Sequence, residues 1–247
     1  STTWLPRLGR SPSFLSASSL INLLSLTAAY LPVALGIADC IVLTGTDLSA
    51  GRAVGITACI AASLLQKSDI ANKMWTGIGA LPIPLVILIV VAIGALIGAF
   101  NGFFVAKFKL HPFIVTLATQ LILYTILLFY VQAGNNNGMA ISSLTDEYRN
   151  FVVGNPPLLN FAGGSIQIPN YVIYAVLLTA LMWFIWNKTT FGKNMFALGA
   201  NEEAARVSGV NVFMTTIAVF ALAGAMYGWA GFVESARIAS NTANTGV

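Results

Sequence analysis

Hydrophobic residues along the chain form long, unbroken runs rather than an alternation of apolar and polar positions. A transmembrane helix needs about 20 consecutive apolar residues. Only helices and closed barrels satisfy their backbone polar groups in lipid, and unbroken runs indicate helices. We therefore predict an all-α polytopic membrane protein, with about six spanning segments in a single transmembrane domain that covers residues 1–247. The runs are Leu20–Thr44, Leu48–Leu65, Leu81–Phe108, Pro112–Gln132, Asn170–Trp186 and Val212–Val233.

Composition supports the membrane assignment. Hydrophobic residues make up 57% of the chain and charged residues 8%, against about 25% charged residues in soluble domains. The net charge is +4, and the twelve Lys and Arg residues are scattered between the apolar runs. This placement is typical of topology and interface anchors rather than of a surface that binds nucleic acid. Strict alternation of the spans divides these cations equally between the two sides, so charge alone leaves the orientation undecided.

The longest connection between the runs is Ala133–Pro169. It opens with GNNNG and contains the pairs Pro156-Pro157 and Gly163-Gly164, so we predict a loop outside the hydrocarbon. The first residues of the chain have no apolar segment of the kind that a signal peptide requires. The chain does not begin with Met, which is compatible with a fragment of a longer protein.

Small residues recur at a four-residue spacing in three of the predicted helices. In lipid this spacing lets two helix backbones approach closely, and packing replaces the hydrophobic effect as the source of association. The pattern predicts a compact bundle. It leaves open whether each seam is generic helix packing or a specific dimer interface. The glycines concerned are Gly51 and Gly55, then Gly94, Gly98 and Gly102, and finally Gly224 and Gly228.

Residues that perform catalysis or bind metals are scarce. The chain has no GxxxxGK[ST] phosphate loop, no HExxH and no CxxC motif, so we expect no catalytic residue, metal site or cofactor in it. Its one histidine, His111, lies in the basic turn KFKLHPF and is interpreted as an interfacial loop residue. Cys40 and Cys59 lie in apolar runs, where cysteine usually acts as a small hydrophobe.

A few polar residues lie within or beside the apolar runs. An ionisable residue at membrane depth costs about 2.5–3.5 kcal/mol, so Asp39 is either functional or near the end of its span and facing the bundle. Asp47, in TGTDLSAGR, can cap a helix that begins at Leu48, with Arg52 one turn further on and able to approach it. This segment is either a capped helix start or a polar element that lines a pathway. Asn101, in a glycine-rich helix, is a second pathway candidate.

Charge is concentrated in one short segment, GANEEAARVSG. Asn201 is a favourable helix N-cap, the two glutamates after it suit the first turn, and Arg206 can pair with Glu202 four residues earlier. Gly209 is a natural terminator. The pattern predicts a helix over Glu202–Ser208 of about 10 Å, too short to span a membrane. It is either a solvated turn or a rigid knob that docks into a groove of another protein.

Two of these segments resemble a known family. The sequence NKTTFGKNMFALGANEEAARVSGVNV, residues 187–212, resembles the signature loop of bacterial sugar ABC-importer permeases, the branched-chain/ribose-type family. GTDLSAGR, residues 45–52, resembles the second signature of that family, and ALPIPLVILIVVAIGALIGAFNG and HPFIVTLATQLILY resemble two of its spans. The family normally has a further span before this region and at least two more helices after it. It normally has an uncharged small or polar residue where this chain has Asp39 and His111.

The resemblance implies a permease subunit of an ABC importer for a monosaccharide, with galactose and its methyl glycosides as the expected substrates. The implied location is the bacterial inner (cytoplasmic) membrane, in contact with membrane lipids and without nucleic acid. The implied partners are a second permease copy in a homodimer, a separate ATPase subunit that hydrolyses ATP, and a periplasmic sugar-binding protein. Residues 188–211 would form the cytoplasmic coupling loop and residues 133–169 a periplasmic loop.

The family's signatures also imply roles for individual residues. Contacts with the ATPase are expected from Gly199, Asn201, Glu202, Glu203, Ala204, Ala205, Arg206, Ser208 and Gly209. The expected signature residues are Gly45, Asp47, Leu48, Ser49 and Gly51. Asp47 and Asn101 are the pathway candidates, as polar groups beside a glycine-rich helix.

Two other functions stay open. A secondary sugar transporter driven by an ion gradient would use Asp39 and Asp47 as ion carriers, and Asp39→Asn would abolish its activity. A membrane-embedded enzyme would need acid–base groups that this chain largely lacks.

Overall fold

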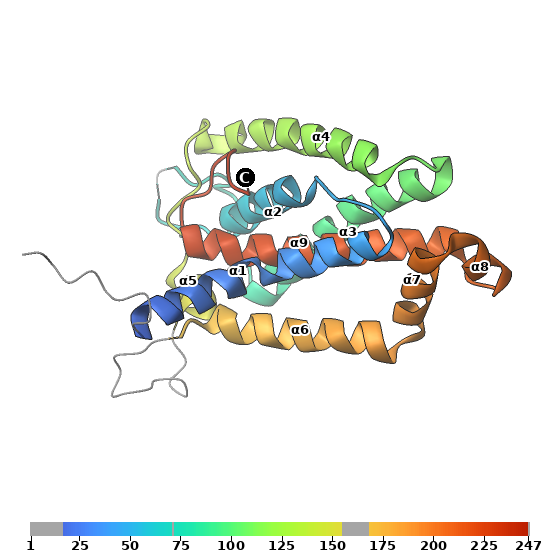
Figure 1. Cartoon of the computed structure of the whole chain (residues 1–247). Helices are drawn as coiled ribbons and strands as arrows, with labels where there is room; N and C mark the ends of the chain where they lie inside the picture. The colour runs from blue at the N-terminus through green and yellow to red at the C-terminus, as the bar shows by residue number, and fades with distance from the viewer. Residues whose placement is uncertain (1–16, 71, 155–167, 247) are drawn as a thin grey trace, which may run out of the picture.

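The computed structural model describes residues 17–70, 72–154 and 168–246. Five helices in this part of the chain are long and apolar enough to cross a membrane, which confirms the predicted all-α polytopic architecture (Figure 1). They are α1 (Ala17–Val42), α3 (Ile83–Phe108), α4 (Pro112–Gln132), α6 (Asn170–Lys188) and α9 (Val212–Ile238). The shorter helices are α2 (Ala50–Leu64), η1 (Gly134–Asn136), α5 (Asp146–Val153), α7 (Thr190–Ala200) and α8 (Glu202–Val207).

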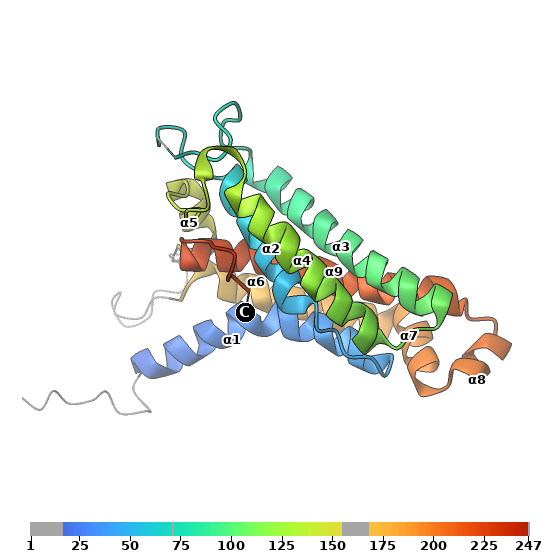
Figure 2. The ribbon, with the colours of Figure 1, turned by 90° about the horizontal axis from the view of Figure 1, so that it is seen from above.

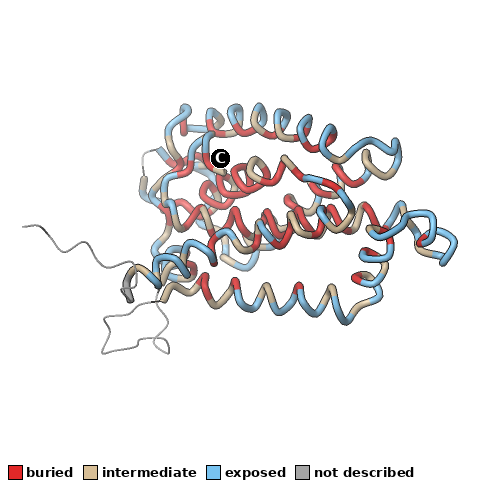
Figure 3. Tube along the Cα trace, in the orientation of Figure 1, coloured by how far each residue is buried: buried red, intermediate tan, exposed pale blue. Residues whose placement is uncertain are grey.

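Helix α9 is the centre of the bundle. In its most apolar stretch 67% of the residues are buried inside the molecule, against 22–33% in the other four spanning helices. Helices α4 and α6 lie on opposite sides of α9, and their outward faces are exposed along most of their length (Figure 3). These exposed faces are apolar, as expected where a helix meets lipid.

The second apolar run, Leu48–Leu65, forms a shorter helix than its length suggested. Helix α2 has 15 residues and is therefore about 22 Å long, less than the hydrocarbon core of about 30 Å. It packs against α9, α3 and α4, and most of its side chains are buried. A helix that is apolar all round is either a membrane span or an interior helix. The run is apolar here because α2 is covered by protein.

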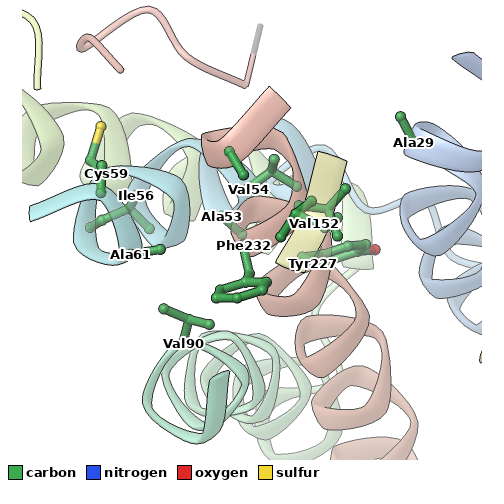
Figure 4. Packing of buried hydrophobic residues seen from close by; sticks show 14 of the residues in the cluster. Ala29, Ala53, Val54, Ile56, Cys59, Ala61, Val90, Val152, Tyr227 and Phe232 are labelled. Carbon is green, nitrogen blue, oxygen red and sulfur yellow. The ribbon is translucent and has the colours of Figure 1, made fainter. Parts of the chain in front are cut away.

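The main core lies where α2, α3, α5 and α9 meet (Figure 4). Phe232 of α9 is fully buried and lies between α2 and Val90 of α3. A second, smaller cluster joins α1, α6 and α9 through Leu35, Met182 and Met226. The bundle is thus held by contacts that α9 makes on several sides.

Glycines bring α3 and α9 into backbone contact. A Cβ atom added at Gly94 would overlap the carbonyl oxygen of Gly224, and one added at Gly98 would overlap that of Phe220. The structure therefore places the α3 and α9 glycines in one seam within the chain. Gly51 and Gly55 of α2 instead lie against the backbone of the C-terminal segment, at Gly246 and Thr245 respectively.

The connection from Ala133 to Pro169 is more ordered than predicted, because it contains η1 and α5. Tyr148 and Val152 of α5 are fully buried, and the Tyr148 hydroxyl donates to the carbonyl oxygen of Phe232 in α9. The sequence analysis predicted a loop outside the hydrocarbon here and did not predict these two short helices. The Pro156-Pro157 and Gly163-Gly164 pairs, like the first residues of the chain, lie outside the described residues.

An ion pair connects this segment to the loop after α2. The Lys67 ammonium lies 2.8 Å from an Asp146 carboxylate oxygen, at the start of α5. Hydrogen bonding and charge from Lys67 lower the pKa of Asp146 below its ordinary value, so this carboxylate is charged at neutral pH. Backbone hydrogen bonds between Ile141 and Asn241 join the same segment to the chain after α9.

Candidate functional site

Helices α7 and α8 project from the end of the bundle where α9 begins (Figures 1 and 2). Helix α8 starts at the predicted N-cap, where Asn201 Oδ1 accepts a hydrogen bond of 3.0 Å from the backbone N–H of Ala204. Arg206 Nη2 lies 2.6 Å from Glu202 Oε1, the predicted pair. Gly209 follows with a φ of +85°, a conformation that favours glycine. Local sequence thus determines both ends of this short helix.

Most of the predicted coupling residues are exposed on α8. Ala205 is the exception on the helix itself, because it is only 3% exposed and faces the bundle. Ala204 is exposed, so the two alanines do not share one face. Sequence reasoning missed Val207, which is 88% exposed at the end of α8. The exposed members of the predicted set are Asn201, Glu202, Glu203, Ala204, Arg206, Ser208 and Gly209, and Gly199 is half-buried.

Helix α7, which the sequence analysis did not predict, attaches α8 to the bundle. Met195 and Leu198 of α7 are buried. Gly199 lies against the carbonyl oxygen of Val42, the last residue of α1, so closely that a Cβ atom would overlap it. The signal that could have found α7 is Thr189, whose hydroxyl caps the helix by accepting from Gly192 N at 3.1 Å.

A cavity of about 620 Å³ separates α8 from the neighbouring end of α3. Asn201, Glu202 and Arg206 line it on one side, and Val105 and Lys109 of α3 line it on another. The short helix is thus attached through α7 and borders open space on the side of α3.

A second group of predicted residues forms a buried polar network at the start of α2. Asp47 Oδ1 accepts hydrogen bonds from Ser49 N at 2.9 Å and from Ser49 Oγ at 2.6 Å. Asn101 Nδ2 of α3 donates to Ser49 Oγ at 2.9 Å, and Thr119 Oγ1 of α4 donates to Asn101 Oδ1 at 2.6 Å. All four side chains are buried. The network therefore joins α3 and α4 to the turn before α2.

Thr116 of α4 fixes the same turn and was missed by the sequence analysis. Its Oγ1 accepts from Leu48 N at 3.1 Å and donates to the carbonyl oxygen of Thr46 at 3.2 Å. Gly45 packs against Pro112, the first residue of α4, and a Cβ atom on Gly45 would lie 2.9 Å from the Pro112 ring. The threonines in the apolar run of α4 were the available signal in the sequence. Sequence alone does not show which helix they face.

Asp47 does not cap a helix beginning at Leu48, because α2 starts at Ala50 and its N-cap is Ser49. Nor does Arg52 pair with Asp47. The Arg52 guanidinium donates to the carbonyl oxygen of Ala243 at 3.1 Å and lies 4.2 Å from the centre of the Tyr124 ring. Asp47 instead closes a tight turn with Ser49, an alternative local hydrogen bond for aspartate.

Asp39, His111 and Cys59 are separate from both groups, whereas Cys40 Sγ lies 4.0 Å from Asp47 Oδ2. Asp39 is buried at the end of α1, and its Oδ1 accepts from Trp186 Nε1 of α6 at 2.7 Å. His111 is exposed, and its Nδ1 accepts from Phe113 N at 3.4 Å at the start of α4. Cys40 and Cys59 are buried free thiols. Within the described ranges, no three His, Cys, Asp or Glu side chains group closely enough to hold a metal ion.

Five membrane-length helices with α9 at their centre, and a short charged helix at one end, define a polytopic α-helical membrane protein. The family described as "Branched-chain amino acid transport system / permease component" matches residues 19–247. The chain belongs to this family.

Three of the relatives identified by sequence are sugar permeases. The chain is 45% identical to the galactose/methyl galactoside import permease protein MglC of Escherichia coli K12, over 95% of this chain and 68% of that protein. It is 41% identical to MglC of Haemophilus influenzae, over 97% of this chain and 69% of that protein. The ribose import permease protein RbsC of H. influenzae is 32% identical, over 96% of this chain and 66% of that protein. No solved structure matches the chain.

Proposed function

We propose that this chain is the transmembrane permease subunit of an ATP-driven importer for galactose and methyl galactosides. The observation that carries the proposal is the 45% identity with the E. coli galactose permease over 95% of the chain. Identity to the ribose permease of H. influenzae is lower, at 32%, which favours galactose over ribose. The proposed location is the bacterial inner membrane.

The proposed role of α8 is to dock into a cleft of a separate ATPase subunit. Its exposed charges, Glu202, Glu203 and Arg206, and the exposed Val207 offer polar and apolar contacts on one short rigid element. Closure of two ATPase subunits would displace α8 in each of two permease copies. Such a displacement shifts the population between inward-open and outward-open states only if ATPase binding favours one of them. The hydrolysis of ATP belongs to the partner.

This docking requires the α8 end of the bundle to be cytoplasmic. The opposite end, which contains α5 and the loops around residues 66–82 and 133–145, would then be periplasmic, where a sugar-binding protein would dock.

The polar network of Asp47, Ser49 and Asn101 is proposed to border the sugar pathway. Its support is that a buried ionisable group such as Asp47 is costly in a membrane protein and is a functional-site candidate by default. In this structure the groups bond to one another, so sugar hydroxyls would have to replace these bonds after the helices separate.

A direct test is co-purification of the full-length native protein in mild detergent, with mass spectrometry of the proteins that accompany it. The expected result is a stoichiometric subunit that carries a phosphate-binding loop. Reconstitution with that subunit and the sugar-binding protein should give galactose uptake that requires ATP. Galactose uptake in vesicles without ATP and without a partner would overturn the proposal and favour an ion-driven transporter.

A further inference from the structure

Asp39 is a buried carboxylate that the proposed function does not yet use. It is 0% exposed and lies one turn before the end of α1. Oδ1 accepts the 2.7 Å hydrogen bond from the indole of Trp186, and Oδ2 has no hydrogen-bond partner among the described residues. Burying a carboxylate in apolar surroundings is unfavourable. Because an apolar residue at this position would avoid that cost, we look for a role that needs the carboxylate itself.

The partner, Trp186, lies where α6 turns into α7. Thr189, three residues later, donates its hydroxyl to the carbonyl oxygen of Ile185 and accepts from Gly192 N. Gly192 lies so close to the carbonyl oxygen of Trp186 that a Cβ atom would overlap it. The turn of α6 that carries Trp186 and the first turn of α7 are thus fixed to each other.

The other end of α7 also meets the end of α1. Gly199 packs against the carbonyl oxygen of Val42, and Val42 is three residues after Asp39, on the adjacent turn. Helix α7 is therefore connected to the last turn of α1 near both of its ends. Helix α8 begins at Glu202, directly after the second connection.

The end of α1 leads straight into the segment that carries the polar network. Gly45 N donates to the carbonyl oxygen of Cys40 at 3.0 Å, and Cys40 Sγ lies 4.0 Å from Asp47 Oδ2. A displacement of this turn of α1 would therefore move the chain that holds Asp47.

We propose that Asp39 is a positioning residue, and that its hydrogen bond to Trp186 transmits displacement of α7 and α8 to α1 and the segment 43–49. This inference rests on the proposed function. The indole is partly covered by the apolar cluster of Leu35, Met182 and Met226, so water competes poorly for the bond. A hydrogen bond with a fixed donor and a buried acceptor defines the relative position of two helices more sharply than apolar contact does.

In the conformation of this structure, the geometry fits a positioning role better than that of an ion carrier. A carrying carboxylate must exchange its ion with water in at least one state. Asp39 has no exposed surface, it does not line the cavity beside α8, and one of its oxygens accepts from a fixed indole.

The test uses the full-length protein with its ATPase subunit and sugar-binding protein in proteoliposomes, where ATP hydrolysed per sugar imported is measured. Asp39→Leu and Trp186→Phe each remove the hydrogen bond and are expected to raise this ratio roughly five- to tenfold, the factor that a hydrogen bond of ordinary strength represents. Asp39→Asn keeps an oxygen acceptor and should stay within about twofold of wild type. Trp183→Phe, an exposed position one turn earlier on α6, is the matched control and should leave the ratio unchanged.

A second measurement checks the contact itself and does not depend on transport. In protein labelled with ¹⁵N at tryptophan, the indole signal of Trp186 should shift in Asp39→Leu and much less in Asp39→Asn.

The transport assay also offers a double-variant test. The variant Asp39→Leu/Trp186→Phe should have a ratio of ATP hydrolysed to sugar imported no higher than that of either single variant, because both substitutions remove the same bond.

Three results would overturn the inference. One is an unchanged ATP-to-sugar ratio in every variant that assembles, which would make the contact only structural. Another is loss of all uptake in Asp39→Asn, which would make the charge essential. The third is a Trp186 indole signal that does not shift in Asp39→Leu. If wild-type protein shows no ATP-dependent uptake with its partners present, the proposed function fails independently of these variants.

Discussion

The seam between α3 and α9 offers the sharpest test of the fold, at Gly98. A Cβ atom there would overlap the carbonyl oxygen of Phe220, and it would lie 2.7 Å from the Phe220 carbonyl carbon and 3.2 Å from Ala221 Cα. All three are backbone atoms, which cannot rotate away as a side chain can. We therefore expect Gly98→Ala to push the two helices apart and Gly98→Leu to prevent stable assembly.

The expected change in the free energy of unfolding for Gly98→Ala is the sum of two opposing contributions. Alanine stabilises a helix interior by about 1 kcal/mol relative to glycine. Overpacking a tight contact costs about 1–3 kcal/mol, and more when backbone must move. Because the added Cβ atom would meet backbone atoms, the cost falls at the upper end of that range, and the net expectation is a loss of about 2 kcal/mol for alanine, equivalent to a fall of a few degrees in Tm for a protein of this size. Leucine adds three more carbon atoms at the same point, so no small shift of the helices accommodates it.

The assay is thermal unfolding of the purified protein in mild detergent, with size-exclusion chromatography to measure assembly. The matched control is Ala92→Leu, because Ala92 lies on the exposed face of the same helix. The control should leave Tm and assembly unchanged although it adds more atoms than Gly98→Ala. If Gly98→Ala is as stable as wild type, or if Ala92→Leu is equally damaging, the close backbone contact does not define the seam.

Three further predictions concern other elements. Glu203→Lys should leave the protein inserted but reduce sugar-stimulated ATPase activity in the reconstituted complex; normal uptake and stimulation in this variant would refute the coupling role. Asn101→Leu removes the acceptor of the buried Thr119 hydroxyl and one of the two bonds of Ser49 Oγ, and should lower stability by about 1–3 kcal/mol, measured by thermal unfolding against the wild type. Tyr148→Phe removes the hydrogen bond to Phe232 and should cost about 1 kcal/mol, and an unchanged Tm would show that α5 is held by apolar packing alone.

The spanning helices could be predicted from the sequence because continuous apolar runs leave few alternatives. The run Pro112–Gln132 coincides with α4, and α9 begins at the predicted residue, Val212. Helix α2 shows the limit of this reasoning. Its residues are apolar because protein surrounds them, and an interior helix and a membrane span have the same composition.

Local hydrogen bonding was partly predictable. Asn201 caps α8 as its position suggested, because an N-cap depends on residues three apart in the chain. Asp47 had two local options, a cap or a turn with Ser49, and sequence does not choose between them. Helix α5 was not predicted, although acidic residues in a first turn, here Asp146 and Glu147, indicate the start of a helix. The many Asn, Gly and Pro residues of the surrounding segment favoured a loop instead.

Contacts between distant residues were not predictable at all. The Asp39–Trp186 bond joins residues 147 positions apart, and nothing in the periodicity of α1 or α6 orients these two side chains toward each other. The same holds for Thr119 and Asn101, since a buried threonine on α4 has several helices that it can face.

The close contacts between helices determine which helix moves first when α8 is displaced. Helices α3 and α9 are in backbone contact through their glycines and should move as one body. The cavity of about 620 Å³ lies between α8 and the end of α3, so a push on α8 meets open space on that side. Helix α7 meets the last turn of α1 closely at Val42 and, through Trp186, at Asp39, and both α7 and α8 also contact α9. The displacement should therefore reach α1 directly, whereas it reaches α3 only through α9. During ATP turnover, the distance between α8 and α1 should therefore change less than the distance between α8 and α3. Paired spin labels on these helices measure both distances, and the reverse order would contradict this reasoning.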